Sequence, residues 1–149
     1  MTGLRILQLD DIMAIKDDLV EDRPIWKNLT KAMVESMLRA VEAAYTYLKD
    51  DQIVACCGAL RGKESWELWA IYSSKFSAFA FARVDAAMAF GEKFRHLWIT
   101  EQGRSKACFS IPSDLKNGAK YAKLLGGKFL RTENSLLFDG VTNDIYEVI

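Results

Sequence analysis

The first third of the chain alternates between a strand pattern and two amphipathic helix patterns. Residues 4–9 alternate apolar and polar side chains, which predicts a first strand. Asp10 or Asp11 is then placed to cap a helix that continues to Val20. Thr30 is a candidate N-cap for a second helix, in which apolar residues recur every three or four positions and share one face. These residues are Met33, Met37, Leu38 and Val41.

The middle of the chain predicts a hairpin followed by an aromatic strand. Residues 44–48 and 53–60 are β-prone, and the polar residues 49–52 between them form a short turn. After a second turn at residues 61–64, residues 66–72 are rich in aromatic and β-branched side chains. We therefore expect three consecutive strands here.

The longest helix is expected directly after these strands. Ser73 or Ser74 is placed to cap it, and it runs over residues 75–94. Residues 95–100 fit either a helix tail or a strand, and the pattern leaves both open. The apolar members of this helix include Phe76, Phe79, Val84, Ala87 and Met88.

The last third predicts a strand, a helix and two closing strands. Residues 106–111 form a strand that ends before Pro112. Ser113 or Asp114 opens a helix that the glycines at 126–127 stop. Strands are then expected at residues 129–131 and in the stretch up to residue 149, with a turn at residues 139–140.

This order, β-α-α-β-β-β-α-β-α-β-β, predicts an α/β (α+β) fold with a mixed sheet covered by helices on both faces. The chain has 149 residues and contains no linker, repeat or low-complexity tract. We therefore expect a single domain over residues 1–149.

The composition excludes several classes of function. Lys plus Arg and Asp plus Glu each number 20, and a neutral chain lacks the basic field that attracts nucleic acid. Adjacent Cys56 and Cys57, with Cys108, indicate reduced thiols that pack in strands, and a lone His96 gives no zinc site. No apolar run approaches the length of a membrane span and no signal peptide is visible, so we expect a cytoplasmic protein.

The strand at residues 107–111, the helix at residues 117–125 and the Gly126-Gly127-Lys128-Phe129 segment resemble the GNAT superfamily of acyl-CoA-dependent N-acetyltransferases. The resemblance implies a mostly antiparallel sheet, acetyl-CoA as cofactor and a primary amine as acceptor. It also implies that the acyl donor lies in a V-shaped cleft between the fourth and fifth strands. The backbone of Ala70, Ile71 and Tyr72 would then hold the acyl carbonyl and the pantetheine arm.

The stretch that would hold the cofactor phosphates departs from the family pattern. GNAT enzymes carry a glycine-rich loop there, whose N–H groups bind the pyrophosphate. Residues 73–80 contain no glycine, so hydroxyls and one cation would have to replace those N–H groups. The candidates are Ser73, Ser74, Lys75 and Ser77, and helix capping explains the serines equally well.

Two residues are candidates for proton transfer. Glu67, on the predicted fourth strand, would act as general base toward the amine, or else is a solvated edge residue. The position of the family's frequent acidic tyrosine is Ala122, and the adjacent Tyr121 would protonate the leaving thiolate or pack as a core aromatic.

The pattern without glycines also resembles the GNAT-like proteins of short-tailed bacteriophages, some of which are internal virion proteins. This resemblance implies an alternative, a non-catalytic protein of the virion or one that binds a host protein in the host cytoplasm. Its partner would then be a protein, with the tryptophans as contact residues and self-association left open.

Overall fold

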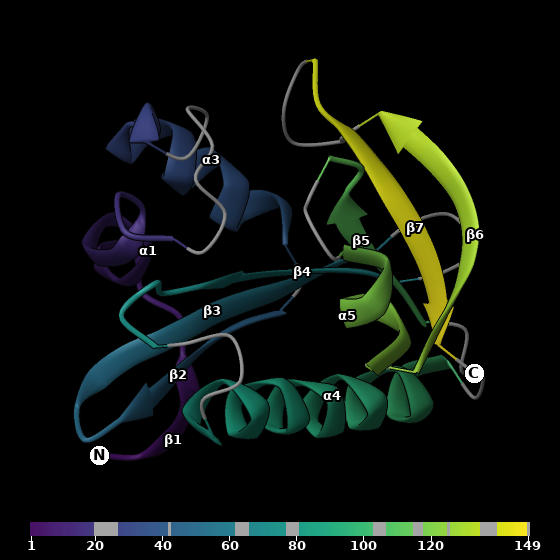
Figure 1. Cartoon of the computed structure of the whole chain (residues 1–149). Helices are drawn as coiled ribbons and strands as arrows, with labels where there is room; N and C mark the ends of the chain where they lie inside the picture. Colours follow the sequence, from purple (N-terminus) through teal and green to yellow (C-terminus); the bar gives the residue numbers. More distant parts are fainter. Residues whose placement is uncertain are drawn as a thin grey trace.

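The computed structural model describes residues 1–19, 27–41, 43–61, 66–76, 81–102, 107–114, 118–124, 126–134 and 140–148. Its helices and strands follow one another in the predicted order (Figure 1). They are β1 (Gly3–Ile6), α1 (Leu9–Ile15), α3 (Lys31–Ala40), β2 (Ala43–Lys49), β3 (Gln52–Arg61), β4 (Trp66–Tyr72), α4 (Phe81–Gln102), β5 (Ala107–Pro112), α5 (Gly118–Leu124), β6 (Gly127–Asn134) and β7 (Thr142–Val148).

The strands form one seven-stranded sheet in the order β1-β2-β3-β4-β5-β7-β6. Every neighbouring pair is antiparallel except β4 and β5, which are parallel. Figure 1 shows α1 and α3 on one face of the sheet and α4 on the other. The predicted mixed, mostly antiparallel sheet with helices on both faces is confirmed. Within the described residues, no helix is both long enough and apolar enough to cross a membrane.

The hairpin of β2 and β3 closes through a two-residue turn. Asp50 and Asp51 both have positive φ, at 49° and 64°, and Lys49 pairs with Gln52 across them. This geometry twists with the strands, and Asp tolerates it better than most side chains. The hairpin prediction is confirmed, and so is the fourth strand with its bounds at Trp66–Tyr72.

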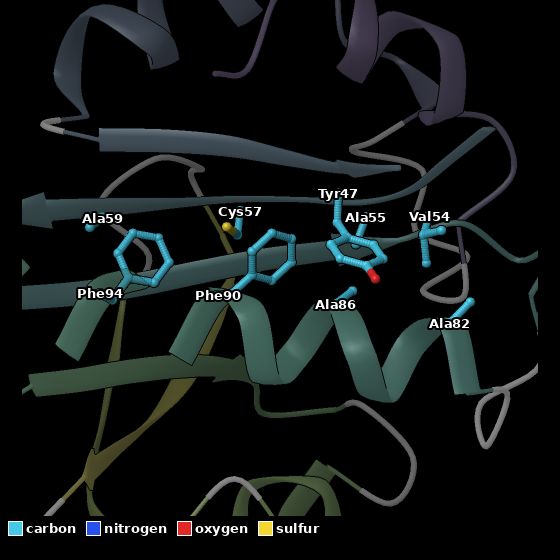
Figure 2. Close-up of a cluster of buried hydrophobic side chains, with 9 residues drawn as sticks. All are labelled: Tyr47, Val54, Ala55, Cys57, Ala59, Ala82, Ala86, Phe90 and Phe94. Carbon is cyan, nitrogen blue, oxygen red and sulfur yellow. The ribbon is translucent and has the colours of Figure 1, made fainter. Parts of the chain in front are cut away.

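Helix α4 packs on β2 and β3 through residues spaced by four. These helix residues and the strand residues that they contact form a buried hydrophobic cluster (Figure 2). Phe90 and Phe94 lie toward Cys57 and Ala59 of β3, whereas the small Ala82 and Ala86 lie nearer Val54. Among the apolar residues named for this helix, Val84 is 46% exposed and Met88 is 70% exposed. Apolar residues occur all around this helix, so their spacing alone did not identify the buried face.

Strand β5 includes Pro112, whereas the sequence predicted that it ends before this residue. Three further boundaries were left open by the sequence or are described only in part. Residues 95–100 are helical, because α4 continues to Gln102. The described part of the last helix begins at Gly118, and residues 115–117 lie outside the described residues. Gly140 takes a positive φ of 75° in the last turn, whereas residue 139 falls outside the described part.

The cap of α3 was predicted correctly, but its buried face only in part. The Thr30 hydroxyl accepts a hydrogen bond from the Met33 N–H at 3.2 Å. Met33 itself is 43% exposed, whereas Val34 and Met37 are buried against α1 and the sheet.

The first strand and helix are shorter than predicted. The strand ends at Ile6, and Gln8 rather than Asp10 or Asp11 is the N-cap of α1. Asp11 occupies the third helical position, from which its carboxylate accepts the Gln8 N–H at 2.9 Å. The helix ends at Ile15 and does not reach Val20, because Leu19 pairs as an extended residue with Ser73.

A buried polar network holds α1 against β1 and β2. The Arg5 guanidinium donates to both carboxylate oxygens of Asp11 at 2.6 Å, and the Thr46 hydroxyl donates to the same carboxylate at 2.8 Å. Burial alone would raise the pKa of Asp11, but the hydrogen bonds from Arg5, the Gln8 N–H and Thr46 lower it below its usual value. The ionised carboxylate therefore stabilises the fold.

We expect Asp11→Ala to lower the free energy of unfolding by about 2 to 3 kcal/mol at pH 7, because Arg5, Gln8 and Thr46 lose a shared acceptor. Asp17→Ala is the matched control, since its exposed pair with Lys16 contributes about 0 to 0.5 kcal/mol. Urea unfolding at several pH values measures both.

The same substitution gives a pH dependence. Because the folded-state pKa of Asp11 is lowered, its contribution is complete above the unfolded-state pKa of about 3.9 and is lost as the pH falls through the folded-state value. The stability difference between wild type and Asp11→Ala should shrink below about pH 4. A difference that stays constant down to pH 2 would contradict this assignment.

Candidate functional site

The parallel contact between β4 and β5 is much shorter than either strand. It comprises three register pairs, and the last of them joins Leu68 to Phe109. Strand β4 continues to Tyr72 and β5 to Pro112, and Figure 1 shows β5 leaving β4 together with β6 and β7. The middle of the sheet therefore opens along the second half of β4.

This opening leaves a main-chain donor and acceptor at Ala70. The Ser73 N–H bonds to Val54 O of β3 at 2.9 Å, and successive residues of a strand turn their N–H and C=O groups to opposite edges. Ile71 and Trp69 therefore bond toward β3, and Ala70 directs its N–H and C=O toward β5 beyond the last register pair. Ala70 is exposed, although its strand is the fourth of seven.

The side chains of the other two predicted positions on β4, Ile71 and Tyr72, pack in the two core clusters. The Ile71 side chain is 3% exposed and packs in the cluster with α1 and α3. The Tyr72 side chain lies on the opposite face, against the α4 cluster. Of the three predicted backbone positions, Ala70 and Tyr72 direct their N–H and C=O groups to the β5 edge, and Ile71 directs its own toward β3.

Four consecutive N–H groups follow β4, and each has an acceptor within the chain. They are the N–H groups of the turn that was predicted to face phosphates. The hydrogen bonds run from Ser73 N to Val54 O (2.9 Å), from Ser74 N to Asp18 O (2.6 Å), from Lys75 N to Ser73 Oγ (3.3 Å) and from Phe76 N to Ser73 O (3.4 Å).

The predicted helix start at Ser73 or Ser74 is wrong. Ser73 is 1% exposed and pairs in an antiparallel bridge with Leu19, and Lys75 lies in a turn. The buried Arg83 side chain of α4 donates to Ser73 O at 2.8 Å, which fixes the turn from below the sheet. Ser77 lies outside the described residues, and the hydroxyl of Ser74 and the ammonium of Lys75 are exposed.

The structure places the backbone of both proton-transfer candidates. Position 67 lies on β4, in register with Leu60 of β3 and Cys108 of β5, one residue before the parallel ladder ends. Tyr121 lies on α5, which packs against β5 and β6, and the neighbouring Ala122 is fully buried. The side chains of Glu67 and Tyr121 lie outside the described part of the chain, so both roles stay predictions.

Sequence reasoning missed the contact between Trp69 and Gly58. A Cβ atom added at Gly58 would lie 2.5 Å from the Trp69 ring, so the indole rests directly on this glycine. The Trp69 Nε1 atom is buried and has no acceptor within the part of the chain that the structure describes. A glycine inside a strand, opposite an aromatic residue, was the available signal.

The cysteines are structural, as their positions in strands predicted. Burial raises the pKa of Cys56 to about 12 and that of Cys57 well above its usual value. Both thiols, and that of Cys108, are buried, so Cys56 and Cys57 stay protonated and are poor nucleophiles. Among the described residues, no three His, Cys, Asp or Glu side chains gather as metal ligands.

Solved acetyltransferase structures share this architecture. A GNAT-family acetyltransferase from Bacillus cereus matches with a TM-score of 0.65 at 13% identity, over 99% of this chain and 96% of that one. An N-acetyltransferase from Staphylococcus aureus Mu50 matches with a TM-score of 0.67 at 15% identity, over 99% and 98%. The Escherichia coli ribosomal-protein-S18-alanine N-acetyltransferase matches with a TM-score of 0.69 at 8% identity, over 99% and 93%.

These likenesses show the fold. The chain has the fold of the GNAT acetyltransferases along nearly its whole length. No family model matches the sequence, and no curated protein matches it.

The residues present fit one part of an acyl-CoA and not another. The free N–H and C=O of Ala70 suit the amide groups of a pantetheine arm, which would lie beside β4 as an extended strand does. The N–H groups of residues 73–76 are already bonded, so a diphosphate meets no free backbone donor in that turn.

We expect Gly58→Ala to lower the free energy of unfolding by about 1 to 3 kcal/mol, because the new methyl group forces the Trp69 ring out of its place. Gly91→Ala is the control on the exposed face of α4, where a Cβ meets nothing, and it should stabilise by roughly 0.5 to 1 kcal/mol. Equal stability of Gly58→Ala and wild type in denaturant unfolding would show that the indole does not rest on Gly58.

Proposed function

We propose that this chain, which has the GNAT acetyltransferase fold, binds an acyl thioester along β4 and transfers its acyl group to a primary amine. One observation carries the proposal: the β4–β5 ladder ends after three pairs, and Ala70, beyond its end, is exposed in the middle of the sheet. Each main-chain group that stays unpaired at this break lacks a hydrogen bond that a continuous ladder would provide. This cost supports a binding role for the break.

In this proposal the chain acts mainly by positioning. The Ala70 N–H and C=O hold the amides of the donor arm, so that the thioester lies near position 68, where the β4–β5 ladder ends. The thioester supplies an activated acyl group, with acetyl-CoA as the simplest donor. Holding donor and amine together in this way converts a bimolecular encounter into a reaction within one complex.

Two side chains would carry the protons. Glu67 takes the proton that the ammonium must lose, directly or through one water molecule, before the nitrogen attacks the acyl carbon. The new C–N bond replaces the C–S bond, and the leaving thiolate takes a proton from Tyr121. The second proton that the attacking nitrogen loses on forming the amide reprotonates Tyr121 through solvent, so the products are an amide and a thiol. Position 67 is three residues from Ala70, about 10 Å along the strand, and in this proposal the base lies toward the acyl end of the donor arm.

A second candidate function is a non-catalytic one, in a bacteriophage virion or bound to a host protein. The bonded N–H groups of the turn after β4 favour it, since they leave a nucleotide cofactor without its usual cradle. So does the exposed apolar stripe of Phe81, Val84 and Met88, spaced by three and four on the outer face of α4. Two results together would select this function: the wild-type chain binds no acyl thioester, and the chain is detected in purified bacteriophage particles.

Ala70→Pro tests the donor site. Proline removes the N–H that faces the opening and leaves the ladder with β3 intact, because Ala70 does not bond to β3. We expect a loss of donor affinity of about tenfold or more, measured by titration calorimetry with acetyl-CoA. Ala70→Ser keeps the N–H and should bind as wild type, and unchanged affinity in a folded Ala70→Pro chain would remove the site.

Glu67→Gln tests the base. We expect kcat for amine acetylation to fall by roughly a hundredfold with KM for the donor nearly unchanged, because the amide cannot accept the proton. The limb of the pH–rate profile that belongs to the carboxylate should also disappear. Glu92→Gln, on the exposed face of α4, is the control, and equal rates for both variants would exclude Glu67 as the base.

A further inference from the structure

The turn at the end of β4 differs from a phosphate-binding loop because its N–H groups already donate hydrogen bonds within the chain. Beyond Tyr72, a ligand that lay along β4 would meet the turn at residues 73–76. All four N–H groups of that turn have acceptors, on β3, on the segment after α1 and on Ser73 itself. A diphosphate is bound by several N–H groups that converge on it, and this turn offers none.

The turn is also fixed from three directions. Strand β3 holds it through Val54, and the segment after α1 crosses it, with Asp18 accepting the Ser74 N–H and Leu19 paired with Ser73. Arg83 holds the Ser73 carbonyl from α4. Leu19, Ser73 and Arg83 are buried, so turning these N–H groups toward a ligand would leave buried polar groups unpaired.

The stretch of β4 beyond the last register pair is long enough for a pantetheine arm. From Leu68 to Ser73 the strand advances five residues, about 16 Å at the usual rise per residue, and the Leu19–Ser73 bridge closes the far end. The unpaired edge of β4 thus has the length of an extended chain of amides and ends at the Leu19–Ser73 bridge.

From these contacts we infer that the donor is recognised through its acyl-pantetheine arm and not through its phosphates, since no N–H group of the described turn at residues 73–76 is free for them. The inference rests on the proposed function, because it names the substrate class of the same site. Such a thioester has two sources, a small free pantetheine thioester or the arm attached to a carrier protein. The acyl-pantetheine chemistry is common to both.

The test compares three donors by titration calorimetry on the wild-type chain. These are acetyl-CoA, S-acetylpantetheine and an acetylated acyl carrier protein. We expect acetyl-CoA and S-acetylpantetheine to bind with dissociation constants equal within about threefold, and adenosine 3′,5′-bisphosphate at millimolar concentration not to compete. Tighter binding of acetyl-CoA by tenfold or more would overturn the inference and leave the proposed function standing.

The remaining outcomes are distinct. If none of the three donors binds at millimolar concentration, the proposed function fails and the inference with it. If the acetylated carrier protein binds at least tenfold more tightly than S-acetylpantetheine, the inference holds and the carrier is the source of the donor. If the two bind equally, the inference holds and the free pantetheine thioester is the source.

Ala70→Pro shows whether both donors occupy the same edge. We expect it to weaken the binding of acetyl-CoA and of S-acetylpantetheine by the same factor, with Glu92→Gln on the exposed face of α4 as the control. If Ala70→Pro abolished S-acetylpantetheine binding and left acetyl-CoA binding unchanged, the nucleotide would be held elsewhere on the chain and the inference would be wrong. If the proline variant does not fold, the donor comparison on the wild-type chain decides alone.

Discussion

The molecule depends on one short contact, the three parallel pairs between β4 and β5. They join an antiparallel group of β1 to β4 to a second antiparallel group of β5, β7 and β6. A longer ladder would make the sheet continuous and cover Ala70, and a shorter one would separate the two groups. The length of this contact therefore sets both the integrity of the sheet and the exposure of its middle strand.

The N-terminal elements reach this junction through the chain that follows α1. Asp11, buried among Arg5, Gln8 and Thr46, sets α1 on the sheet, and the segment after the helix then crosses the end of β4. The network is remote from Ala70 in sequence, but it positions the segment after α1, whose Asp18 carbonyl accepts the hydrogen bond of the Ser74 N–H. The contacts of the first fifteen residues thus reach the turn after β4 through a single stretch of backbone.

Local signals predicted the elements whose contacts are local. The polar turn between β2 and β3, the Thr30 cap and the aromatic run of β4 depend on neighbouring residues, and the sequence pattern identified them. The Ser73 turn depends on Val54 and Asp18, which are distant in the chain, so the pattern of two serines before an apolar run was misread as a helix cap. The family resemblance led us to expect an opening beside β4, where the β4–β5 ladder ends early. The hydrogen bonds of the turn after β4 became visible only in the assembled structure.

The buried thiols give the two groups of strands separate intrinsic reporters. Cys56 and Cys57 lie in β3, on opposite faces of the first group, and Cys108 lies in β5 of the second. A buried thiol reacts with an alkylating reagent only when its surroundings open, so each modification rate measures the local free energy of opening. Equal rates would mean that three pairs suffice to couple both groups into one cooperative unit, and faster labelling of Cys108 would mean that the C-terminal group opens by itself.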